Sequence, residues 1–519
     1  MQKIIELKVL PDEAVDDDRL RDHMARTLGI RKEDITGFHL LRRAIDARPR
    51  QPKVLLTMQV FIGEPIGSTF GETIVEPTCF PDVGQASRQV LVIGAGPAGL
   101  FAALRLIEKG IRPVVLERGK DVRARRRDLA ALNKEGVINP ESNYCFGEGG
   151  AGTYSDGKLY TRSNKRGDVN RILKLLVQFG ADPAILVDAH PHIGTNKLPH
   201  IIQTMRQQIT DSGGIFLFEK KVVDFVLRDG TIKSVKTASG EFFDGDSVIL
   251  ATGHSARDIF RLLHQKKIAI EAKPFALGVR IEHPQPLIDS IRYGIPSPYL
   301  PPAAYSLVEQ IRGKGVFSFC MCPGGIIAPA ATDEGELVVN GWSPSRRNNP
   351  YANSGIVVTV EEKDMQPFAG QGPLMGLAFQ QAVEQKAFAA GGGRFVAPAQ
   401  RMADLVARRP SATLPDCSYL PGIHSVPLQE VLPDFIFEDL RRGFEVFGEK
   451  MKGYLTNEAV VVATESRTSS PVRIPRDPDT LRHPQITNLF PCGEGAGYAG
   501  GIVSAAMDGE KVADMVADS

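Results

Sequence analysis

The stretch 89–119 restricts the fold of this chain more than any other part of its sequence. It opens with an apolar, mostly β-branched run at 90–93, which is typical of a strand buried on both faces. A G-x-G-x-x-G turn follows over 94–99, and apolar residues at i, i+3, i+4 and i+7 from Leu100 predict a helix. Because a second apolar run at 113–116 predicts another strand, the stretch reads as a complete βαβ unit.

Each part of this unit suits the binding of a dinucleotide. Gly94 allows a tight turn, Gly96 lets a pyrophosphate approach the backbone, and Gly99 lets the helix and strand lie close together. The helix N-terminus presents free N–H groups and a positive dipole end to an anion. Glu117 ends the second strand, where an acid can bind both ribose hydroxyls, which favours FAD or NAD over NADP. The alternative is a glycine-rich turn in an ordinary βαβ unit.

The composition excludes several classes of protein. The chain has 519 residues, enough for about three domains, and a net charge of +1, which draws it to neither nucleic acid nor membrane. Its first residues carry charges too early for a signal peptide, and no apolar run is long enough to span a bilayer. The six cysteines are scattered, as is typical of a reduced, cytoplasmic protein without a disulfide framework.

The sequence pattern of residues 1–85 predicts a small separate α+β domain. Its expected strands and helix cover 4–10, 16–28 (the helix), 35–47 and 53–62. Basic residues gather around the hairpin between the last two strands: Arg42, Arg43, Arg48, Arg50 and Lys53. They could contact RNA or an acidic partner, or form an ordinary solvated face. Residues 63–88, rich in Gly, Pro, Ser and Thr, predict a linker.

A second glycine-rich stretch covers 143–159, after a basic helix expected over 120–134, whose arginines could meet phosphate or face solvent. Its five glycines within 147–157 are costly in regular structure, but they let backbone N–H groups line an anion or ring site. Lys158 adds a positive charge beside it. The alternative, a flexible surface loop, does not explain bulky residues such as Phe146.

Two further groups of residues could carry chemistry. Cys320 and Cys322 form a C-x-C pair whose spacing would place both thiols on one face of a strand, either toward an active site or packed. His190 and His192 suggest a metal, but without further ligands a structural or substrate-contact role is favoured, and we expect no metal site.

The chain then returns twice to the nucleotide-binding sheet. A predicted buried strand ends in Ala-Thr-Gly at 251–253, where Gly253 lets the loop pass close to a cofactor. Near the C-terminus, 488–504 predicts a short strand, a glycine-rich turn containing Glu494, and the start of a helix at Gly500-Gly501. A helix N-terminus at that position stabilises negative charge, which favours the reduced form of a flavin.

Together these motifs resemble the glutathione-reductase-like FAD flavoproteins. The stretches 141–159, 320–325 and 467–473 are similar to a narrower group, the large and functionally uncharacterised bacterial FAD-dependent dehydrogenases with a small N-terminal domain. This resemblance covers nearly the whole chain. It implies an α/β fold: a Rossmann-like FAD-binding domain, a large inserted substrate or capping domain, and the small N-terminal α+β domain.

The resemblance also implies domain limits and site residues. The FAD-binding domain would comprise 86–165, 215–275 and 465–519, and the inserted domain 166–214 and 276–464. The cofactor-binding residues would be Gly94, Gly96, Pro97, Ala98, Gly99, Glu117, Arg118, Gly149, Gly150, Gly152, Ser155, Lys158, Leu159, Val222, Ala251, Thr252, Gly253, Gly493, Glu494, Gly501, Ile502 and Val503. Glu494 stands where many relatives have Asp, which leaves open whether its contact is direct or through water.

We therefore expect an oxidoreductase with non-covalent FAD that acts on a small molecule. The candidates for catalysis are Lys158, Arg467, Cys320 and Cys322. The arginine fork of Arg467 could hold a substrate carboxylate, or it could tie two domains together through a carboxylate. NAD(P)H stays open as an electron donor, although no second G-x-G-x-x-G unit follows position 119. The alternatives are a flavin-dependent nucleic-acid-modifying protein and a flavin-stabilised binding protein without turnover.

Overall fold

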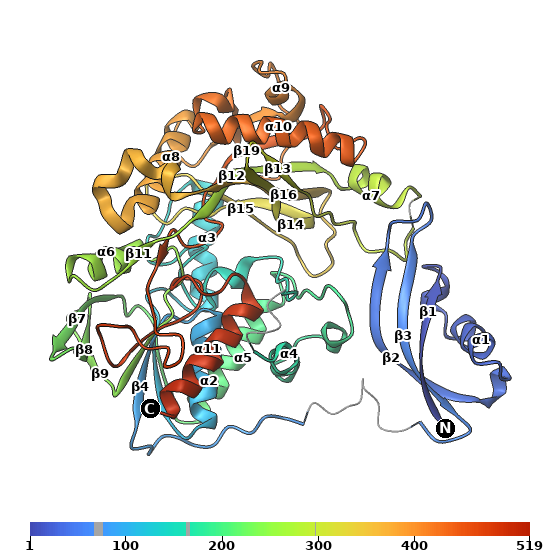
Figure 1. The fold of residues 1–519 in the computed structure, drawn as a ribbon, viewed down its shortest axis with the longest axis horizontal. Coiled ribbons are helices and arrows are strands. Elements are labelled where there is room, and N and C mark those ends of the chain that lie inside the picture. The colour runs from blue at the N-terminus through green and yellow to red at the C-terminus, as the bar shows by residue number, and fades with distance from the viewer. Residues whose placement is uncertain (67–75, 162–166, 296) are drawn as a thin grey trace.

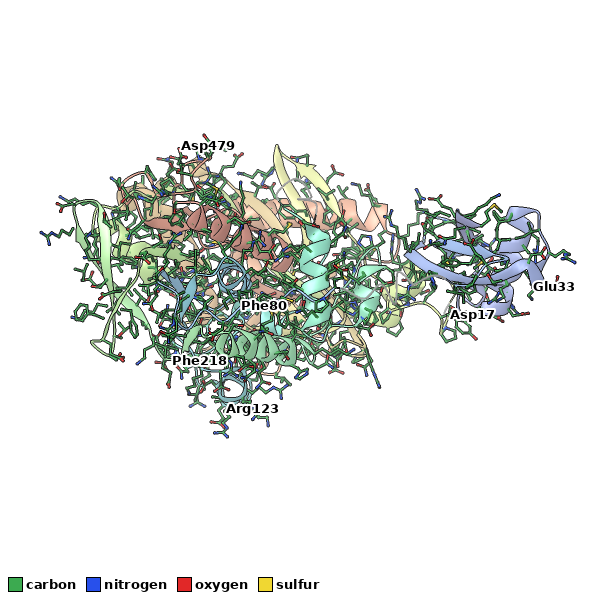
Figure 2. All side chains as sticks on the ribbon, turned by 90° about the horizontal axis from the view of Figure 1, so that it is seen from below. Asp17, Glu33, Phe80, Arg123, Phe218 and Asp479 are labelled. Carbon is green, nitrogen blue, oxygen red and sulfur yellow. The ribbon has the colours of Figure 1, made fainter. Side chains whose placement is uncertain are left out.

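The N-terminal residues form a unit that projects from the rest of the molecule (Figures 1 and 2). The computed structural model describes residues 1–66, 76–161, 167–295 and 297–519. The unit is an antiparallel sheet of order β1-β3-β2 with one helix against it. Its elements are β1 (Gln2–Val9), α1 (Asp17–Leu28), β2 (Ile35–Asp46) and β3 (Lys53–Ile62). The three strands and the helix expected from the sequence are confirmed. The predicted linker 63–88 includes 67–75, which lie outside the described residues.

The centre of the molecule is a five-stranded parallel sheet of order β21-β10-β4-β5-β6. Its strands are β4 (Gln89–Ile93), β5 (Arg112–Leu116), β6 (Ile215–Leu217), β10 (Ser247–Leu250) and β21 (Leu489–Pro491). Alternate residues of β4 face opposite sides: Val90 and Val92 join the core on one face, and Leu91 and Ile93 join the core on the other. The sheet is thus covered on both faces, as the apolar run predicted.

Helices cover one face of this sheet, and a smaller sheet with one helix covers the other. The first layer contains α2 (Pro97–Glu108), α4 (Val169–Gln178), α5 (Leu198–Asp211) and α11 (Ile502–Ala517). The second contains β7 (Val222–Arg228), β8 (Thr231–Thr237), β9 (Phe242–Asp244) and α6 (Arg257–Gln265). The helix α3 (Val122–Glu135) follows β5. This α/β arrangement agrees with the predicted Rossmann-like fold.

The packing of α4 and α5 differs from the expectation that 166–214 belongs to the inserted domain. Ile172 and Leu176 of α4 and Ile201 and Met205 of α5 share one apolar core with α2 and α11. The physical reason is that both helices carry an apolar face that the parallel-sheet unit buries. Residues 162–166, at the start of this segment, lie outside the described part of the chain. The other domain limits remain predictions.

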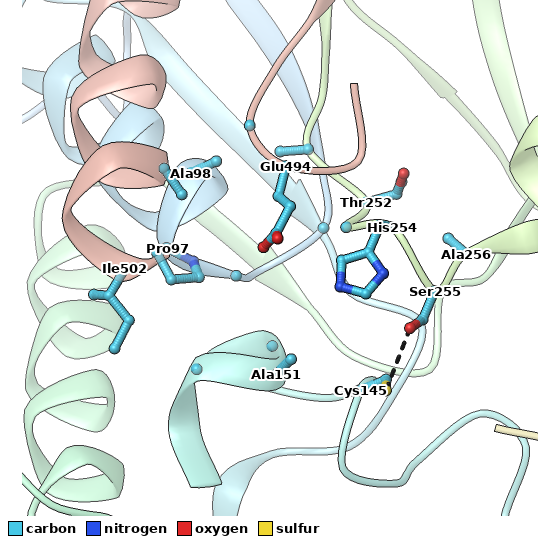
Figure 3. Close-up of a pocket in the computed structure, with 18 of the residues that line it drawn as sticks. Pro97, Ala98, Cys145, Ala151, Thr252, His254, Ser255, Ala256, Glu494 and Ile502 are labelled. Atoms are coloured by element: carbon cyan, nitrogen blue, oxygen red, sulfur yellow. Dashed lines mark hydrogen bonds between the residues drawn. The ribbon is translucent and has the colours of Figure 1, made fainter. Parts of the chain in front are cut away.

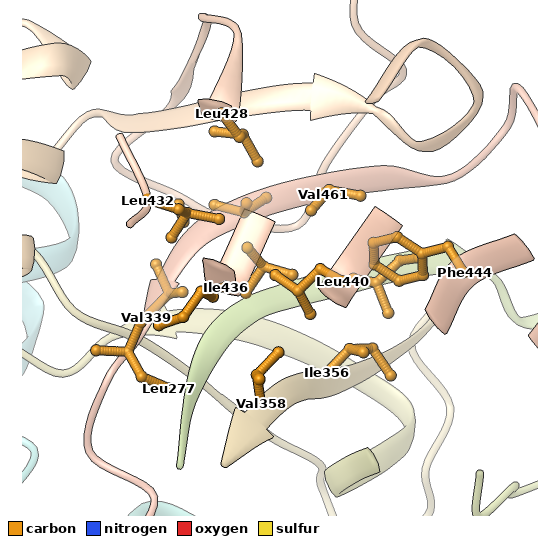
Figure 4. Packing of buried hydrophobic residues seen from close by; sticks show 14 of the residues in the cluster. Leu277, Val339, Ile356, Val358, Leu428, Leu432, Ile436, Leu440, Phe444 and Val461 are labelled. Atoms are coloured by element: carbon orange, nitrogen blue, oxygen red, sulfur yellow. The ribbon is translucent and has the colours of Figure 1, made fainter. Parts of the chain in front are cut away.

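A large sheet with a helix across it forms the inserted part (Figure 4). The strand order is β13-β14-β16-β12-β19-β17-β18, and β15 also pairs with β14. Ile436, Leu440 and Phe444 of α10 (Asp434–Lys450) join the same core as Ile356 and Val461 of the sheet. The strands are β12 (Phe275–Pro284), β13 (Val308–Ile311), β14 (Lys314–Pro329), β15 (Val339–Trp342), β16 (Tyr351–Val360), β17 (Ala397–Arg401), β18 (Ile423–Ser425) and β19 (Val460–Glu465).

Short contacts join the units to one another. The pair β11 (Glu271–Ala272) and β20 (Val472–Arg473) lies where the chain enters and leaves the large sheet. The helices α7 (Gln285–Tyr293), α8 (Met375–Gly391) and α9 (Met402–Val406) complete the inserted part. Arg43 of the N-terminal unit pairs with Asp188, with a backbone bridge at the same residues and an ion pair of 2.8 Å. None of the helices in the described residues has the length and apolar character that a membrane crossing requires.

Candidate active site

A cavity of about 440 Å³ opens at the carboxyl ends of the central parallel strands. Ile93, Leu116, Ala251 and Cys492, at or just after the ends of β4, β5, β10 and β21, all line it. Open α/β sheets bind their ligands at this edge, and cavities of roughly 300–1,000 Å³ are usual for cofactors and small molecules. Phe319, from the inserted part, lines the same cavity.

The three glycines of the first turn have distinct surroundings. A Cβ on Gly94, which has a φ of +104°, would lie 2.4 Å from the Ala251 carbonyl oxygen. A Cβ on Gly99 would lie 1.9 Å from the Gly94 carbonyl oxygen, so the helix and turn could not come so close. Apart from its chain neighbours, the nearest atom to a Cβ on Gly96 would be the Gly150 Cα at 3.9 Å, and this Cβ would stand in the cavity. The tight turn and the close packing thus match the reasoning from sequence.

Two helix N-termini open on this cavity (Figure 3). Pro97 begins α2, Ile502 begins α11, and both residues line the cavity. At Gly500 and Gly501 a Cβ would have no atom within 4 Å, so open space lies over the start of α11. Unpaired N–H groups and the positive dipole ends of both helices favour an anion there. The arrangement suits the pyrophosphate of a dinucleotide.

The carboxylate of Glu117 joins three segments of this cradle. It accepts hydrogen bonds from the backbone N–H groups of Ala95, Gly119 and Gly147, each at 2.9 Å. An ionised carboxylate has about four lone-pair directions, so capacity for one further donor remains. Glu117 lines the cavity, and its expected contact with a ribose hydroxyl remains a prediction.

Buried and paired arginines hold the loops around the cradle. Arg125 of the basic helix α3 is fully buried and donates to the backbone carbonyls of Asn143, Tyr144, Glu148 and Gly150. Arg123, Arg126 and Arg127 of the same helix are exposed, so the expectation that most of these arginines face solvent is confirmed. Arg125 is the exception, because its donors serve the glycine-rich stretch instead.

Arg118, which lines the cavity, is also held in place by ion pairs. Arg118 lies 2.6 Å from Glu141 and 2.9 Å from Asp258, and its guanidinium stands over the Phe146 ring at 4.0 Å. Lys221 binds the same two carboxylates. These cations therefore serve to hold the wall together rather than to leave free charge in the cavity.

Two polar side chains, Glu494 and His254, point into the cavity from the loops that follow the neighbouring strands β21 and β10 (Figure 3). Within the described residues neither makes a hydrogen bond to the protein. Burial raises the pKa of Glu494 to about 7, although Lys273 acts to lower it. Burial, together with Arg467, Arg257 and Lys273, lowers the pKa of His254 to about 3. Glu494 can thus exchange a proton near neutral pH, while His254 stays neutral.

The structure separates the two thiols of the C-x-C pair. The register of β14 against β16 shifts between Phe319 and Cys322, and Cys320 has a φ of 48°. Cys320 is exposed and lines the cavity, whereas Cys322 is buried and accepts a hydrogen bond from Arg280. The expectation that both lie on one face is wrong because this bulge interrupts the alternation. Burial also raises the pKa of Cys322 to about 12.

Lys158 lines the cavity at the end of the glycine-rich stretch, and its ammonium donates to the Met321 carbonyl on the bulged strand. It therefore joins the loop of the parallel-sheet unit to the wall of the inserted part. Asp156, also at the cavity, pairs with Arg347 at 2.7 Å. Although burial acts to raise it, Arg347 and Lys158 lower the pKa of Asp156.

Arg467 lines the cavity, but its guanidinium belongs to a buried ion cluster. It donates to Glu384 at 3.2 and 2.9 Å, to Glu336 at 3.0 Å and to Thr332 at 2.8 Å. Arg257 of α6 binds the same two carboxylates at 2.8 and 3.0 Å. Although burial acts to raise it, Arg257 and Arg467 hold the pKa of Glu384 at about 2. Arg467 was expected either to bind a substrate carboxylate or to join two domains through a protein carboxylate, and this geometry supports the second interpretation.

Most of the residues expected to bind the cofactor line this cavity. The exceptions are Gly99, Gly149 and Leu159, which lie behind the lining. Sequence reasoning missed a further group that does line it: Cys145, His254, Ser255, Phe319 and Asn340. His254 and Ser255 directly follow the Ala-Thr-Gly segment, so their position was a usable signal.

The histidines of the 189–200 segment have structural contacts. His192 bonds the Ser345 carbonyl oxygen at 3.1 Å, and the His190 ring lies 4.9 Å from the ring of Tyr160. Burial lowers the pKa of His192, so its imidazole stays neutral at neutral pH.

The residues present fit FAD. Two helix N-termini suit its pyrophosphate, the Glu494 carboxyl offers an unused partner for a hydroxyl group, and Gly96 and Gly501 leave room where a side chain would intrude. Four protein families match parts of the chain. They are an FAD-dependent protein C-terminal domain at 274–468, an FAD binding domain at 87–130, glucose inhibited division protein A at 199–283, and a domain of unknown function at 1–61.

Curated proteins also resemble this chain. An uncharacterized protein of Clostridium beijerinckii is 39% identical over 521 residues, which cover 97% of each chain. A tRNA uridine 5-carboxymethylaminomethyl modification enzyme, MnmG of Alkaliphilus metalliredigens, is 29% identical over 166 residues, which cover 32% of this chain and 24% of the enzyme.

Among solved structures, the flavin-dependent brominase Bmp2 is 12% identical with a TM-score of 0.37, over 83% of this chain and 79% of that one. The comparisons support the FAD-dependent character of the resemblance and leave the likeness to glutathione-reductase-like flavoproteins a prediction. FAD is the cofactor that the matched domains and the cavity both indicate. The chain belongs to the family of FAD-dependent proteins that includes the Clostridium beijerinckii protein.

Proposed function

We propose that this protein is an FAD-dependent oxidoreductase, a dehydrogenase or reductase, that acts on a small molecule. The observation that carries this proposal is the continuity of one cavity. Gly96 and Gly501 of the cofactor cradle and Phe319, Cys320 and Asn340 of the inserted part all line it. A small molecule held against the inserted wall would therefore share one cavity with the cofactor.

The residues of the chain supply binding and orientation. When bound, FAD supplies the two-electron redox chemistry. The N-termini of α2 and α11 stabilise its negative charges, and Glu494 binds one of its hydroxyl groups. Phe319 gives the cavity an apolar surface on the side of the inserted part. Lys158 places a positive charge at the wall, near where negative charge would develop.

An anaerobic screen tests this proposal. The purified holoprotein is mixed with a panel of small alcohols, amines, hydroxy acids and unsaturated compounds, and the absorption of oxidised flavin is followed. NADH and NADPH are included as donors. We expect at least one compound to change the redox state of the flavin. A ligand that shifts the flavin spectrum without any electron transfer would favour a binding protein without turnover instead.

A second candidate is the modification of a nucleic acid, and one observation favours it. The name of the Alkaliphilus metalliredigens relative describes a tRNA modification enzyme. The basic hairpin gives this candidate limited support, because Arg43 pairs with Asp188 and Arg48 pairs with Asp46. Binding of bulk tRNA, compared between the wild type and the Arg42→Ala, Arg43→Ala, Arg48→Ala triple variant, tests it. Salt-sensitive binding that the triple variant loses would support this candidate.

A further inference from the structure

His254 occupies a distinctive place in the cavity. It follows the Ala-Thr-Gly segment at the end of β10, where Gly253 turns the chain with a φ of +72°. Figure 3 shows its ring directed into the cavity, with Glu494 to one side and Ser255 and Cys145 to the other. Its charged neighbours Arg257 and Arg467 belong to the junction with the inserted part. His254 thus lies where the cofactor cradle approaches the inserted wall.

The ring nitrogens of His254 are available to a ligand. Across the described ranges, no protein group makes a hydrogen bond to either nitrogen, whereas the adjacent polar side chains are engaged. Ser255 donates to the Cys145 sulfur at 3.4 Å, and Arg257 donates to Glu336 and Glu384. Because the half-buried His254 ring lines the cavity, both nitrogens can bind a molecule that enters it.

The surroundings of His254 determine its charge. Burial and three cations, Arg467, Arg257 and Lys273, oppose a positive charge on the ring, and the Glu384 carboxylate opposes this effect only in part. At neutral pH the imidazole therefore has one N–H donor and one lone-pair acceptor. It can donate a hydrogen bond to a neutral polar group, accept one from it, or do both, but it has no positive charge to balance an anion.

Near this wall the cations Arg467 and Lys158 are both already bound by protein groups, Lys158 by the Met321 carbonyl oxygen. The guanidinium of Arg467 is held by Glu384 and Glu336, so it cannot also form two parallel hydrogen bonds to a substrate carboxylate without losing those bonds. Asn340 and Thr468, which also line the cavity, have no ionisable group. A carboxylate brought to this wall would lose its water and could pair fully with these cations only by displacing their present bonds, which is costly.

We propose that His254 contacts the substrate directly and that its neutral imidazole hydrogen-bonds an uncharged carbonyl or hydroxyl group at this end of the cavity. This inference rests on the proposed function, because it takes the inserted side of the cavity as the substrate side. It replaces the carboxylate substrate considered for Arg467 with an uncharged one.

Matched probes test the proposal on the FAD-loaded protein. Benzamide and benzoate have nearly the same shape, but only benzoate is charged, and both are titrated while the visible flavin spectrum is recorded. We expect benzamide to perturb the spectrum with a dissociation constant at least tenfold lower than that of benzoate. In His254→Phe, which keeps a ring of similar size, benzamide affinity should fall about two- to tenfold. His254→Gln, which keeps a donor and an acceptor, should retain most of it.

His264→Phe, at an exposed histidine of α6, is the control and should bind benzamide like the wild type. Equal or tighter benzoate binding, no response to benzamide, or unchanged benzamide affinity in His254→Phe would each overturn the proposal. FAD content and anaerobic reduction are measured in parallel. Failure of the wild type to hold FAD, or to exchange electrons with any compound, would count against the proposed function itself and not against His254.

Discussion

Replacement of Glu494 by glutamine should remove a pH dependence from FAD binding. The Glu494 carboxyl points into the cavity that the N-termini of α2 and α11 also face (Figure 3). When ionised, it competes with the anionic pyrophosphate for the same positive surroundings, and the two negative charges repel. When protonated, it is neutral and can donate a hydrogen bond. FAD should therefore bind more tightly to the protonated form.

The size of the effect follows from the pKa of about 7. Below that value Glu494 is mostly neutral and affinity is full; as the pH rises through the pKa, affinity is lost. If only the protonated form binds well, the FAD dissociation constant should rise about tenfold from about pH 6 to about pH 8. This is about 1.4 kcal/mol of binding free energy. Glu494→Gln has no proton to lose, so its dissociation constant should stay level over the same range.

The assay is a titration of flavin-free protein with FAD, followed by quenching of FAD fluorescence at several pH values and constant ionic strength. Glu510→Gln is the matched control. Burial raises the pKa of Glu510 to about 7 as well, but this residue pairs with Arg171 and is not part of the cavity lining. Its profile should follow the wild type. Parallel profiles for the wild type and Glu494→Gln, or an affinity that rises with pH, would refute the reasoning.

Further changes test other parts of the structure. Gly96→Val should give colourless protein, since its side chain would stand in the cradle; bound flavin absorption measures this. Arg467→Lys should lower the free energy of unfolding by about 3 kcal/mol or more, because the buried carboxylates lose the paired hydrogen bonds of the guanidinium. Calorimetry should show this loss, while the flavin chemistry stays unchanged. Iodoacetamide should label Cys320 and spare buried Cys322, as mass spectrometry of the native protein would reveal. A chain that begins at residue 86 should still bind FAD; insoluble or flavin-free protein would show that residues 1–85 belong to the cofactor unit.

Local patterns predicted the nucleotide-binding part of the fold well. The run at 90–93 and the turn at 94–99 require a strand and a sharp turn whatever surrounds them, and β4 and α2 lie there. The strands and helix of residues 1–62 were equally clear, because their alternating and helical periods are undisturbed. For the same reason most of the expected cofactor residues line the cavity, since they follow directly from the ends of these elements.

Features that depend on distant partners could not be read from local patterns. The helix spacing of Arg125 does not reveal that four backbone carbonyls of a later segment surround its guanidinium. The bulge in β14 separates Cys320 from Cys322, and a two-residue period cannot foresee it. Arg467 meets Glu384 across 83 residues of sequence, so only the folded chain shows that its fork is occupied.

The contact between α2 and α11 affects how the protein is made. The two helices pack so closely that a Cβ on Gly509 would lie 2.2 Å from the Ala98 carbonyl oxygen. The ribosome makes α11 about four hundred residues after α2, a delay of about 20–80 s at roughly 5–20 residues per second. During that time the apolar surface of α2 lacks this partner and is open to chaperones. Nascent chains should capture FAD only after α11 emerges, so truncated products should be flavin-free and prone to degradation.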